Sequence, residues 1–289
     1  MRLADRRRLF AAGILSGPLA WTLAFMFVPY AIMFTYSFYT RRFPTMVPDF
    51  QLGNYLALFL DAQYYQVLLR TMKIASLVTI AAVALAYPLA YFLVFKIASP
   101  RLRAALYVAV VVPLWVSYLL RAYTWKTILG SEGVLNSFLV WIGLLDEPTP
   151  LFLYNQFAMV ITLTYIFVPF CVMPIFTALE KIPRSLIEAS KDLGVGRLRT
   201  FLAITLPLSV PGILAGATFT FSLTMGDFVA PFLVGGADGA LIATVVQSQF
   251  GTALNWPLGS ALSMVMLLIV LTIITLSDRL ERAGRLDLA

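Results

Sequence analysis

The sequence predicts an all-α membrane protein with six transmembrane helices. Of its 289 residues, 61% are hydrophobic and 12% are charged. Soluble domains are about 45–50% apolar and about 25% charged, so this chain has too few charges to cover a surface in water. Apolar stretches of about 20 residues, the length that crosses a bilayer as a helix, recur along the chain. A lipid bilayer is therefore the expected surrounding of its apolar faces.

Six segments have the length and apolar composition of a spanning helix. They lie within Ala11–Ser37, Ile74–Phe95, Ala104–Tyr123, Gln156–Leu179, Leu208–Val234 and Pro257–Ser277. Several contain proline, which neighbouring helices can accommodate by satisfying the freed backbone groups. The first segment follows three arginines, as in a signal peptide, but no charge occurs from Leu9 to Thr40. That is longer than a signal-peptide apolar region of about 7–15 residues, so we expect an uncleaved first span.

The loops between these spans differ in basic charge. Most of the 21 Lys and Arg residues fall in one alternate set of loops and at the two ends of the chain. The basic loops and ends contain Arg2, Arg6, Arg7, Arg8, Lys96, Arg101, Arg103, Lys181, Arg184, Lys191, Arg197, Arg199, Arg279, Arg282 and Arg285. The positive-inside rule places this set, and therefore both termini, in the cytoplasm. This placement explains the net charge of +7 better than nucleic-acid binding does.

Two outer loops are long enough to have structure of their own. Arg41–Arg70 and Trp125–Asn155 mix turn residues with Trp and Tyr, which favours short helices at the membrane interface. We find no fixed-period repeat and no second soluble domain.

Several classes of site are excluded by composition. The chain has no histidine and one cysteine, Cys171, in an apolar stretch where it is expected to be a small buried side chain. The usual zinc sites and the Ser-His-Asp and Cys-His catalytic arrangements therefore cannot form. We predict no catalytic residue, no metal site and no cofactor, and an intramembrane enzyme is disfavoured. The phosphate-binding pattern G-x-x-x-x-G-K-[ST] is also absent, so ATP would have to bind another chain.

The longest cytoplasmic loop, between the fourth and fifth spans, carries the strongest functional signal. It predicts two short helices joined at Gly194 in a left-handed turn, with Pro183 in the first helical turn. Four residues of the first helix share one narrow face at helical spacing. These are Leu186, Ala189, Ser190 and Leu193, with Arg184, Glu188, Lys191 and Asp192 around them. Small apolar residues inside a charged rim indicate a surface on which another protein docks.

This loop resembles the EAA loop of binding-protein-dependent ABC importer permeases. The family motif is Glu-Ala-Ala, three residues, Gly, nine residues, Ile, one residue and Leu-Pro. The chain has Glu188-Ala189-Ser190, Gly194, Ile204 and Leu206-Pro207 at the same spacing. Its one departure is Ser190 in place of the second alanine. Looser similarity to the spermidine/putrescine-type subgroup covers roughly residues 65 to 280, including Arg121–Trp125, Gly226–Gly236 and Asn255–Gly259.

The resemblance implies a type I ABC importer permease (MetI-like) fold in a bacterial cytoplasmic (inner) membrane. Residues 1–64 would be an N-terminal span and outer loop, 65–280 the transport core with its coupling loop at about 180–207, and 281–289 a cytoplasmic tail. It further implies that the first helix of the loop is the coupling helix, which sits in a cleft of the ATPase. Arg184, Glu188, Ala189, Ser190, Asp192 and Gly194 would form or shape that joint, and Glu188 would pair with a basic residue of the ATPase.

The implied partners are a second homologous permease, two ATP-binding subunits, an extracytoplasmic solute-binding protein and the lipid bilayer. The chain itself would not be an enzyme. A polyamine such as spermidine or putrescine is the expected solute, while an opine, a phosphonate or an amino-acid derivative would use the same architecture. A secondary transporter or channel is the alternative of another class. It would be expected to have inverted repeats and broken helices near the midplane, and we detect no such internal symmetry.

A second group of residues indicates a solute path. Asp227 is the one acid within a predicted span, where an ionisable group costs about 2.5–3.5 kcal/mol and should face a cavity or a partner. Such an acid would lower the electrostatic barrier for a cation, but it could equally pair with Arg121 or Lys126 or lie at the outer interface. Tyr118, Tyr123, Trp125 and Trp256 crowd the outer ends of the third and sixth spans. Their rings could hold an ammonium group or form an ordinary aromatic belt.

Overall fold

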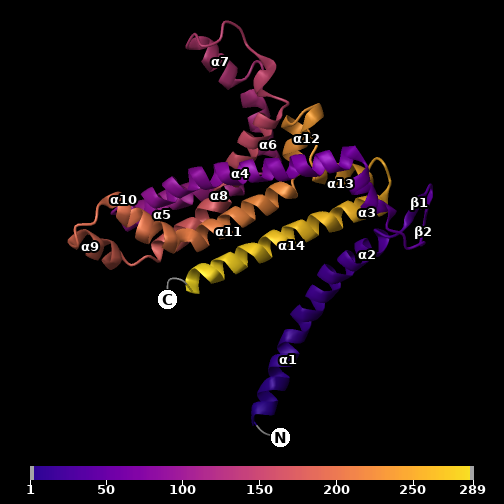
Figure 1. Ribbon diagram of the computed structural model, residues 1–289, viewed down its shortest axis with the longest axis horizontal. Coiled ribbons are helices and arrows are strands. Elements are labelled where there is room, and N and C mark those ends of the chain that lie inside the picture. Colours follow the sequence, from indigo (N-terminus) through magenta and orange to yellow (C-terminus); the bar gives the residue numbers. More distant parts are fainter. Residues whose placement is uncertain (1–2, 287–289) are drawn as a thin grey trace. The chain divides into compact units, whose positions relative to one another are not determined.

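The computed structural model describes residues 3–286 and is almost entirely helical (Figure 1). The α-helices are α1 Leu3–Thr22, α2 Val28–Tyr36, α3 Gly53–Leu60, α4 Ala62–Phe95, α5 Pro100–Val111, α6 Tyr118–Leu129, α7 Val134–Trp141, α8 Gln156–Glu180, α9 Arg184–Asp192, α10 Arg197–Thr200, α11 Leu206–Met225, α12 Val229–Val234, α13 Ile242–Phe250 and α14 Trp256–Leu286. π-Helical turns link α1 to α2 at Leu23–Phe27 and α10 to α11 at Phe201–Thr205. Short 3₁₀ turns lie at Val112–Trp115, Pro150–Phe152 and Ala237–Gly239. Strands β1 Thr40–Arg42 and β2 Thr45–Val47 form a two-stranded antiparallel sheet in which Arg41 pairs with Met46.

Contacts divide the described chain into two units. One contains residues 3–64 with 246–265, and the other contains residues 65–245 with 266–286. Within the first unit, the end of α2 is joined to α3 by hydrogen bonds. The hydroxyls of Ser37 and Tyr55 lie 2.7 Å apart, and Asn54 Nδ2 donates to the carbonyls of Ser37 and Tyr39, 2.8 Å from each oxygen. Side chains of the first span, such as Trp21, are exposed, as expected for a helix that lipid surrounds.

Within residues 3–286, five helical stretches are long and apolar enough to cross a membrane. They are Gly13–Tyr36, Ala62–Phe95, Gln156–Glu180, Arg197–Met225 and Trp256–Arg282. A sixth span results if Pro100–Trp115 and Tyr118–Trp141, which are bent by 93°, count as one. The third predicted span, Ala104–Tyr123, is therefore not a straight helix. Pro113 cannot donate a backbone hydrogen bond, and the chain becomes extended at Val116 before α6 begins.

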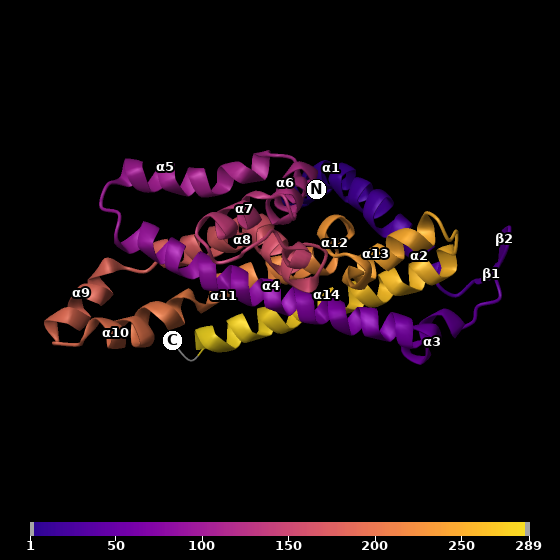
Figure 2. The ribbon, with the colours of Figure 1, turned by 90° about the horizontal axis from the view of Figure 1, so that it is seen from above.

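The core of the second unit is built from α4, α8 and α11, which run side by side (Figures 1 and 2). α8 and α11 approach closely because α11 carries glycines at the contact. A Cβ on Gly212 would lie 2.5 Å from Ala178 Cβ, and one on Gly216 would lie 2.9 Å from Cys171 Sγ. Small residues of this kind allow membrane helices to pack with their backbones close together. Cys171 is fully buried at this contact, as predicted.

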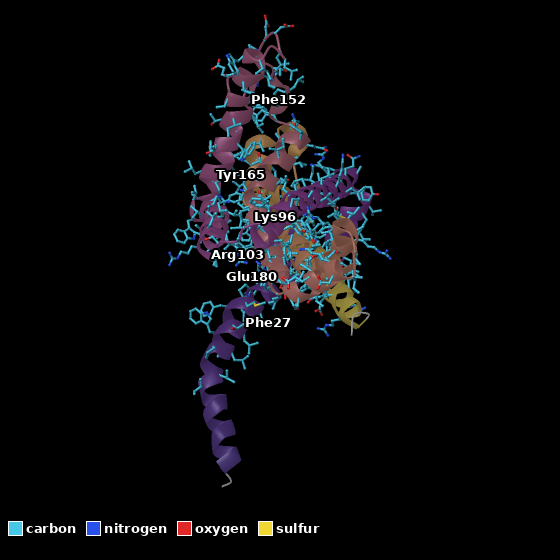
Figure 3. The ribbon with its side chains drawn as sticks, turned by 90° about the vertical axis from the view of Figure 1, so that its left-hand side faces the viewer. Phe27, Lys96, Arg103, Phe152, Tyr165 and Glu180 are labelled. Carbon is cyan, nitrogen blue, oxygen red and sulfur yellow. The ribbon has the colours of Figure 1, made fainter. Side chains whose placement is uncertain are left out.

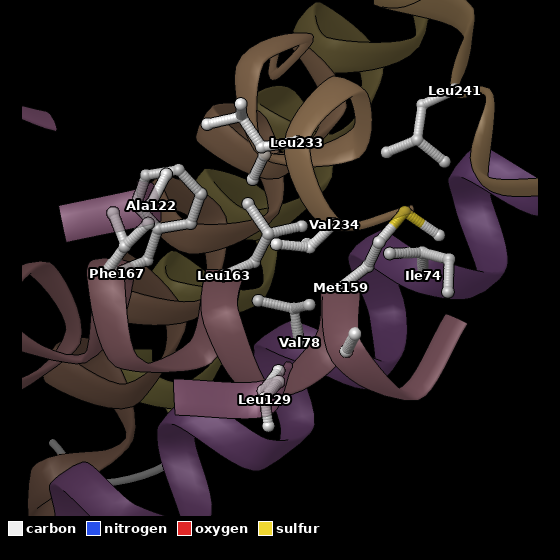
Figure 4. Close-up of a cluster of buried hydrophobic side chains, with 13 residues drawn as sticks. Ile74, Val78, Ala122, Leu129, Met159, Leu163, Phe167, Leu233, Val234 and Leu241 are labelled. Atoms are coloured by element: carbon white, nitrogen blue, oxygen red, sulfur yellow. The ribbon is translucent and has the colours of Figure 1, made fainter. Parts of the chain in front are cut away.

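Two of the apolar clusters in this core join α4 to α8. The cluster in Figure 4 joins Ile74 and Val78 of α4 to Met159 and Leu163 of α8 and to Leu233 of α12. The second lies toward the C-terminal ends of α4 and α8. It contains Ala82, Ala86, Ala90, Leu93, Val94, Cys171, Val172, Ile175, Phe176, Leu179 and Ile182. α5 is joined to the end of α8 by a 3.7 Å salt bridge between Arg103 and Glu180, which lie close together in Figure 3.

The fifth span differs from its predicted limits. The helical stretch runs from Arg197 to Met225, whereas Leu208–Val234 was predicted. Gly226, Asp227 and Phe228 then form a break before α12. The prediction that Asp227 lies within a span was therefore wrong: it lies in the turn between α11 and α12.

Candidate functional site

The predicted coupling loop folds as two short helices, α9 and α10, joined by a turn at Gly194. Gly194 has φ +74°, so the predicted left-handed conformation is confirmed. Its N–H donates to the carbonyl of Lys191 at 2.8 Å, and the N–H of Val195 donates to that of Ser190 at 3.0 Å. This pair of bonds is the Schellman arrangement that ends a helix at a glycine. Pro183 precedes α9 with an extended ψ of 127° and does not lie in its first turn, because the turn from α8 needs an extended residue there.

Ser190 joins α9 to α10. Its hydroxyl lies 2.8 Å from that of Thr200, and both residues are buried. We had expected Ser190 on the outer face of α9, but the Thr200 hydroxyl offers it a hydrogen bond inside the loop. Because α10 continues into the span Arg197–Met225, this bond fixes α9 to the base of a membrane helix.

The outer face of α9 is left uncovered within the chain. Leu186 and Ala189 are exposed, and Leu193 is 82% exposed. On the inner side, Ile187 packs against the second apolar cluster. Three of the four residues predicted to share a docking face are therefore exposed. The opposite side of the helix is held against the rest of the chain by Ile187 and Ser190.

The charged residues of α9 surround this face, as the sequence predicts. Arg184, Glu188, Lys191 and Asp192 are all exposed. Glu188 forms no salt bridge within the part of the chain that the structure describes. Arg184, Glu188 and Lys191 also line a hollow of about 260 Å³ beside the end of α4. An unpaired carboxylate at the edge of an apolar face can accept a charged hydrogen bond from a partner.

The second candidate site centres on Asp227, which is 8% exposed. Its Oδ1 accepts a hydrogen bond from the N–H of Ala230 at 3.0 Å, in the first turn of α12. Its Oδ2 accepts one from the hydroxyl of Tyr118. The carboxylate therefore caps a helix and ties α6 to the turn after α11.

Arg121 is a buried charge that the sequence did not single out for a site. It is 8% exposed, its Nη1 donates to the carbonyl of Ile166 at 3.2 Å, and its guanidinium lies 5.8 Å from the centroid of the Tyr118 ring. Asp227 and Arg121 thus contact the same tyrosine, but they form no salt bridge with each other among residues 3–286. Of the alternatives left open for Asp227, a salt bridge with Arg121 or Lys126 is not formed among these residues, and the Tyr118 hydroxyl contacts the carboxylate instead. The sequence carries one signal for this buried charge, because Arg121 directly follows the uncharged run Trp115–Leu120.

The remaining aromatic candidates have other neighbours. The ammonium of Lys126 lies 5.8 Å from the Tyr123 ring. Trp125 is half-buried and packs on Tyr165, with 5.4 Å between ring centroids. Trp256 belongs to the other unit, where its ring lies 5.7 Å from that of Phe250. Of the four aromatic candidates, Tyr118 alone is hydrogen-bonded to Asp227 in the described structure.

Comparison with known proteins decides the family. Residues 10–283 match the family model described as "Binding-protein-dependent transport system inner membrane component". The chain belongs to this family. As a permease, it is a multi-pass transport protein of the inner membrane, as the sequence predicts.

Relatives and solved structures agree with this assignment. The permease is 38% identical over 253 residues to the spermidine/putrescine transport system permease protein PotB of Escherichia coli K12, a match that covers 86% of this chain and 90% of PotB. A bacterial alginate ABC transporter, solved with an alginate-bound periplasmic protein, contains a chain that superposes with a TM-score of 0.78 at 19% identity. That match covers 98% of both chains. An inward-facing MetNI methionine ABC transporter matches with a TM-score of 0.58 at 19% identity over 79% of this chain and 98% of its own. The predicted MetI-like fold is confirmed.

Proposed function

We propose that this permease forms half of the membrane path of an ATP-driven importer for polyamines such as spermidine and putrescine. The similarity to PotB across most of both chains supports the solute class. The permease would work with a second homologous permease, two ATP-binding subunits and an extracytoplasmic solute-binding protein. Because the sequence lacks a phosphate-binding loop, ATP binds the partner subunits.

The observation that carries the coupling part of this proposal is the Ser190–Thr200 bond between α9 and α10. A helix with an exposed apolar face transmits force only if its base is rigid. α9 is held by this bond and by the Schellman turn at Gly194, and Ile182 just before it is buried in the core. When ATP closes the ATP-binding subunits, they push on Leu186, Ala189 and Leu193, and α8 and α11 move with α9 as one packed body.

The charged groups of α9 orient the joint. Glu188 pairs with a basic residue of the ATP-binding subunit, and Arg184 and Asp192 add contacts on either side of the apolar face. Gly194 sets the angle at which the chain leaves the helix. This arrangement requires the loop and both termini to lie in the cytoplasm, which the basic loops favour. Residues 65–280 form the transport core, with residues 1–64 as a peripheral span and outer loop.

Asp227 contributes to the path as a negative group for a cationic solute. Its Oδ2 is held by Tyr118 and its Oδ1 by the backbone of α12. An ammonium group of the solute competes with the tyrosine hydroxyl for Oδ2, and the rings of Tyr118, Tyr123 and Trp125 add cation–π contacts.

Reconstitution tests this function. The permease, its homologous partner, the ATP-binding subunit and the solute-binding protein are placed in proteoliposomes, and uptake of labelled spermidine is measured with and without ATP. The expected result is uptake that needs ATP and all four components. Uptake by the permease without ATP would instead indicate a secondary transporter, and transport of other solutes with no transport of spermidine would reject the polyamine assignment.

A further inference from the structure

A hollow of about 260 Å³ lies between α9, the end of α4 and the start of α10. One part of its wall is aromatic. Tyr91 and Phe95 of α4 stack with 4.9 Å between ring centroids, and Tyr91 meets Phe201 at 5.8 Å with the rings nearly perpendicular. The buried Thr200 and Thr205 also line it. These ring contacts give the hollow a fixed wall.

The rim of this hollow is strongly basic. Four cationic side chains, from α9, α10 and the turn after α4, line it together with a single acid, Glu188. The four are Lys96, Arg184, Lys191 and Arg197. None of them forms a salt bridge within residues 3–286, and all are exposed. The hollow therefore has an unneutralised positive charge that an anion would offset.

The position of the hollow indicates where the anion comes from. α4 ends at Phe95, and the fifth span begins at Arg197, so each of these spans has one end at the hollow. Lys96 lies in the short connection between α4 and α5, and α5 begins near Arg103, which pairs with Glu180 at the end of α8. With the cytoplasmic orientation proposed above, this level is that of the lipid headgroups in the cytoplasmic leaflet. That leaflet contains acidic lipids, and basic pockets between helices on this side bind their headgroups.

We infer that this hollow binds the phosphate headgroup of an acidic phospholipid. Arginine guanidinium groups bind phosphate oxygens in pairs, and lysine adds a point charge. The aromatic wall then contacts the glycerol and the upper acyl chain. A carboxylate from the ATP-binding subunit would use the cations but not this wall. Leu186, Ala189 and Leu193, the apolar face on which that subunit is proposed to dock, do not line the hollow, whereas Arg184 and Glu188 lie at the edge of both surfaces.

A headgroup bound in the hollow would contact three segments, the end of α4, α9 and α10. These segments must move together during coupling. It would connect Lys96 at the end of α4 to Arg184 and Lys191 on α9 and to Arg197 on α10. Acidic lipid would thus stiffen the joint beneath the coupling helix. The inference uses the proposed orientation of the permease but not its solute.

Lipid retention by the permease, purified together with its partner subunits, tests the inference without any transport assay. Native mass spectrometry counts phosphatidylglycerol and phosphatidylcholine bound after exchange from mixed micelles. We compare the wild type with Lys96→Gln/Arg197→Gln. The matched control is Arg101→Gln/Arg199→Gln, which removes the same charge outside the hollow. Each charge removed from the hollow should lower phosphatidylglycerol binding roughly fivefold, while the control stays within about twofold of wild type.

Several results would overturn the inference. Equal losses in both double variants would mean that general surface charge binds the lipid. Full displacement of the lipid by excess inorganic phosphate would make the site one for free phosphate. Unchanged lipid binding, with loss of the co-purifying ATP-binding subunit, would make the hollow a protein contact. If the double variant aggregates, Lys96→Gln and Arg197→Gln are measured singly, and a loss below twofold in both rejects the site.

Discussion

The hydrogen bond between Ser190 and Thr200 predicts an asymmetric mutational response. Thr200→Val removes a hydroxyl and leaves that of Ser190 buried, with no second side-chain hydrogen bond in the described structure. Ser190→Ala leaves the hydroxyl of Thr200, which still donates to the carbonyl of Gly196 at 3.3 Å. The two changes remove the same bond, but only Thr200→Val leaves a buried hydroxyl without a side-chain partner.

The expected costs follow from this difference. A buried polar group without a partner costs about 1–3 kcal/mol, whereas the net loss of one hydrogen bond costs about 0.5–1.5 kcal/mol. Thr200→Val should therefore loosen α9 by about 1–3 kcal/mol. Ser190→Ala should loosen it by about 1 kcal/mol or less, because Thr200 keeps a second acceptor.

This loosening is measured by the hydrogen-exchange rates of the amides in residues 184–195. The sample is the assembled transporter without nucleotide. The number of solutes imported per ATP hydrolysed, measured in proteoliposomes, reports its effect on coupling. We expect faster exchange and poorer coupling in the order wild type, Ser190→Ala, Thr200→Val. In the double variant the Ser190→Ala change should rescue part of the Thr200→Val effect, because no hydroxyl is then left unsatisfied. Equal effects of the single variants, or strict additivity in the double variant, would refute a direct bond between the two side chains.

Three further changes test other parts of the permease. Glu188→Lys should abolish ATP-dependent uptake while membrane insertion survives. The control Glu147→Lys, which makes the same charge change in an outer loop, should transport normally. Normal uptake by Glu188→Lys would show that Glu188 has no coupling role. Asp227→Asn should weaken uptake of a cationic solute more than that of a neutral one, since it removes the negative charge but not the side chain; equal losses would make Asp227 structural only. Gly212→Val should lower the thermal stability of the purified permease by about 1–3 kcal/mol, because its Cβ would lie 2.5 Å from a side-chain carbon of α8. Gly196→Val, where a Cβ meets nothing within 4 Å, is the control, and an equal loss there would argue against close packing of α8 on α11.

The spacing of residues predicted the coupling loop well, because its turn depends on local chemistry. A glycine after an amphipathic run of nine residues ends a helix whatever surrounds it, and Gly194 does so. The inward side of that helix was harder to predict. Ser190 lies next to Leu186 and Ala189 in helical projection, and only the hydroxyl of Thr200, ten residues later, makes the inward position favourable.

The break in the third span and the surroundings of Asp227 were missed for a related reason. Proline in an apolar stretch is compatible with a kinked span or with a broken one, and the choice depends on which neighbours satisfy the freed carbonyls. Just after Pro113, between Trp115 and Tyr118, the chain turns by 93° between two helices. That turn begins α6 at Tyr118, whose hydroxyl reaches Asp227. Contacts between residues 109 positions apart cannot be inferred from either local pattern.

Site-directed cross-linking of α9 tests whether this helix is the contact for an ATP-binding subunit. Cys171 is fully buried, so a cysteine introduced by Ala189→Cys is the reactive thiol on the exposed face of α9. A short bifunctional reagent should join this cysteine to the ATP-binding subunit in the assembled transporter, and Trp141→Cys on α7 should give no such product. If Ala189→Cys reacts with a membrane-impermeant reagent added outside intact cells, or never cross-links to the ATP-binding subunit, α9 is not the coupling helix.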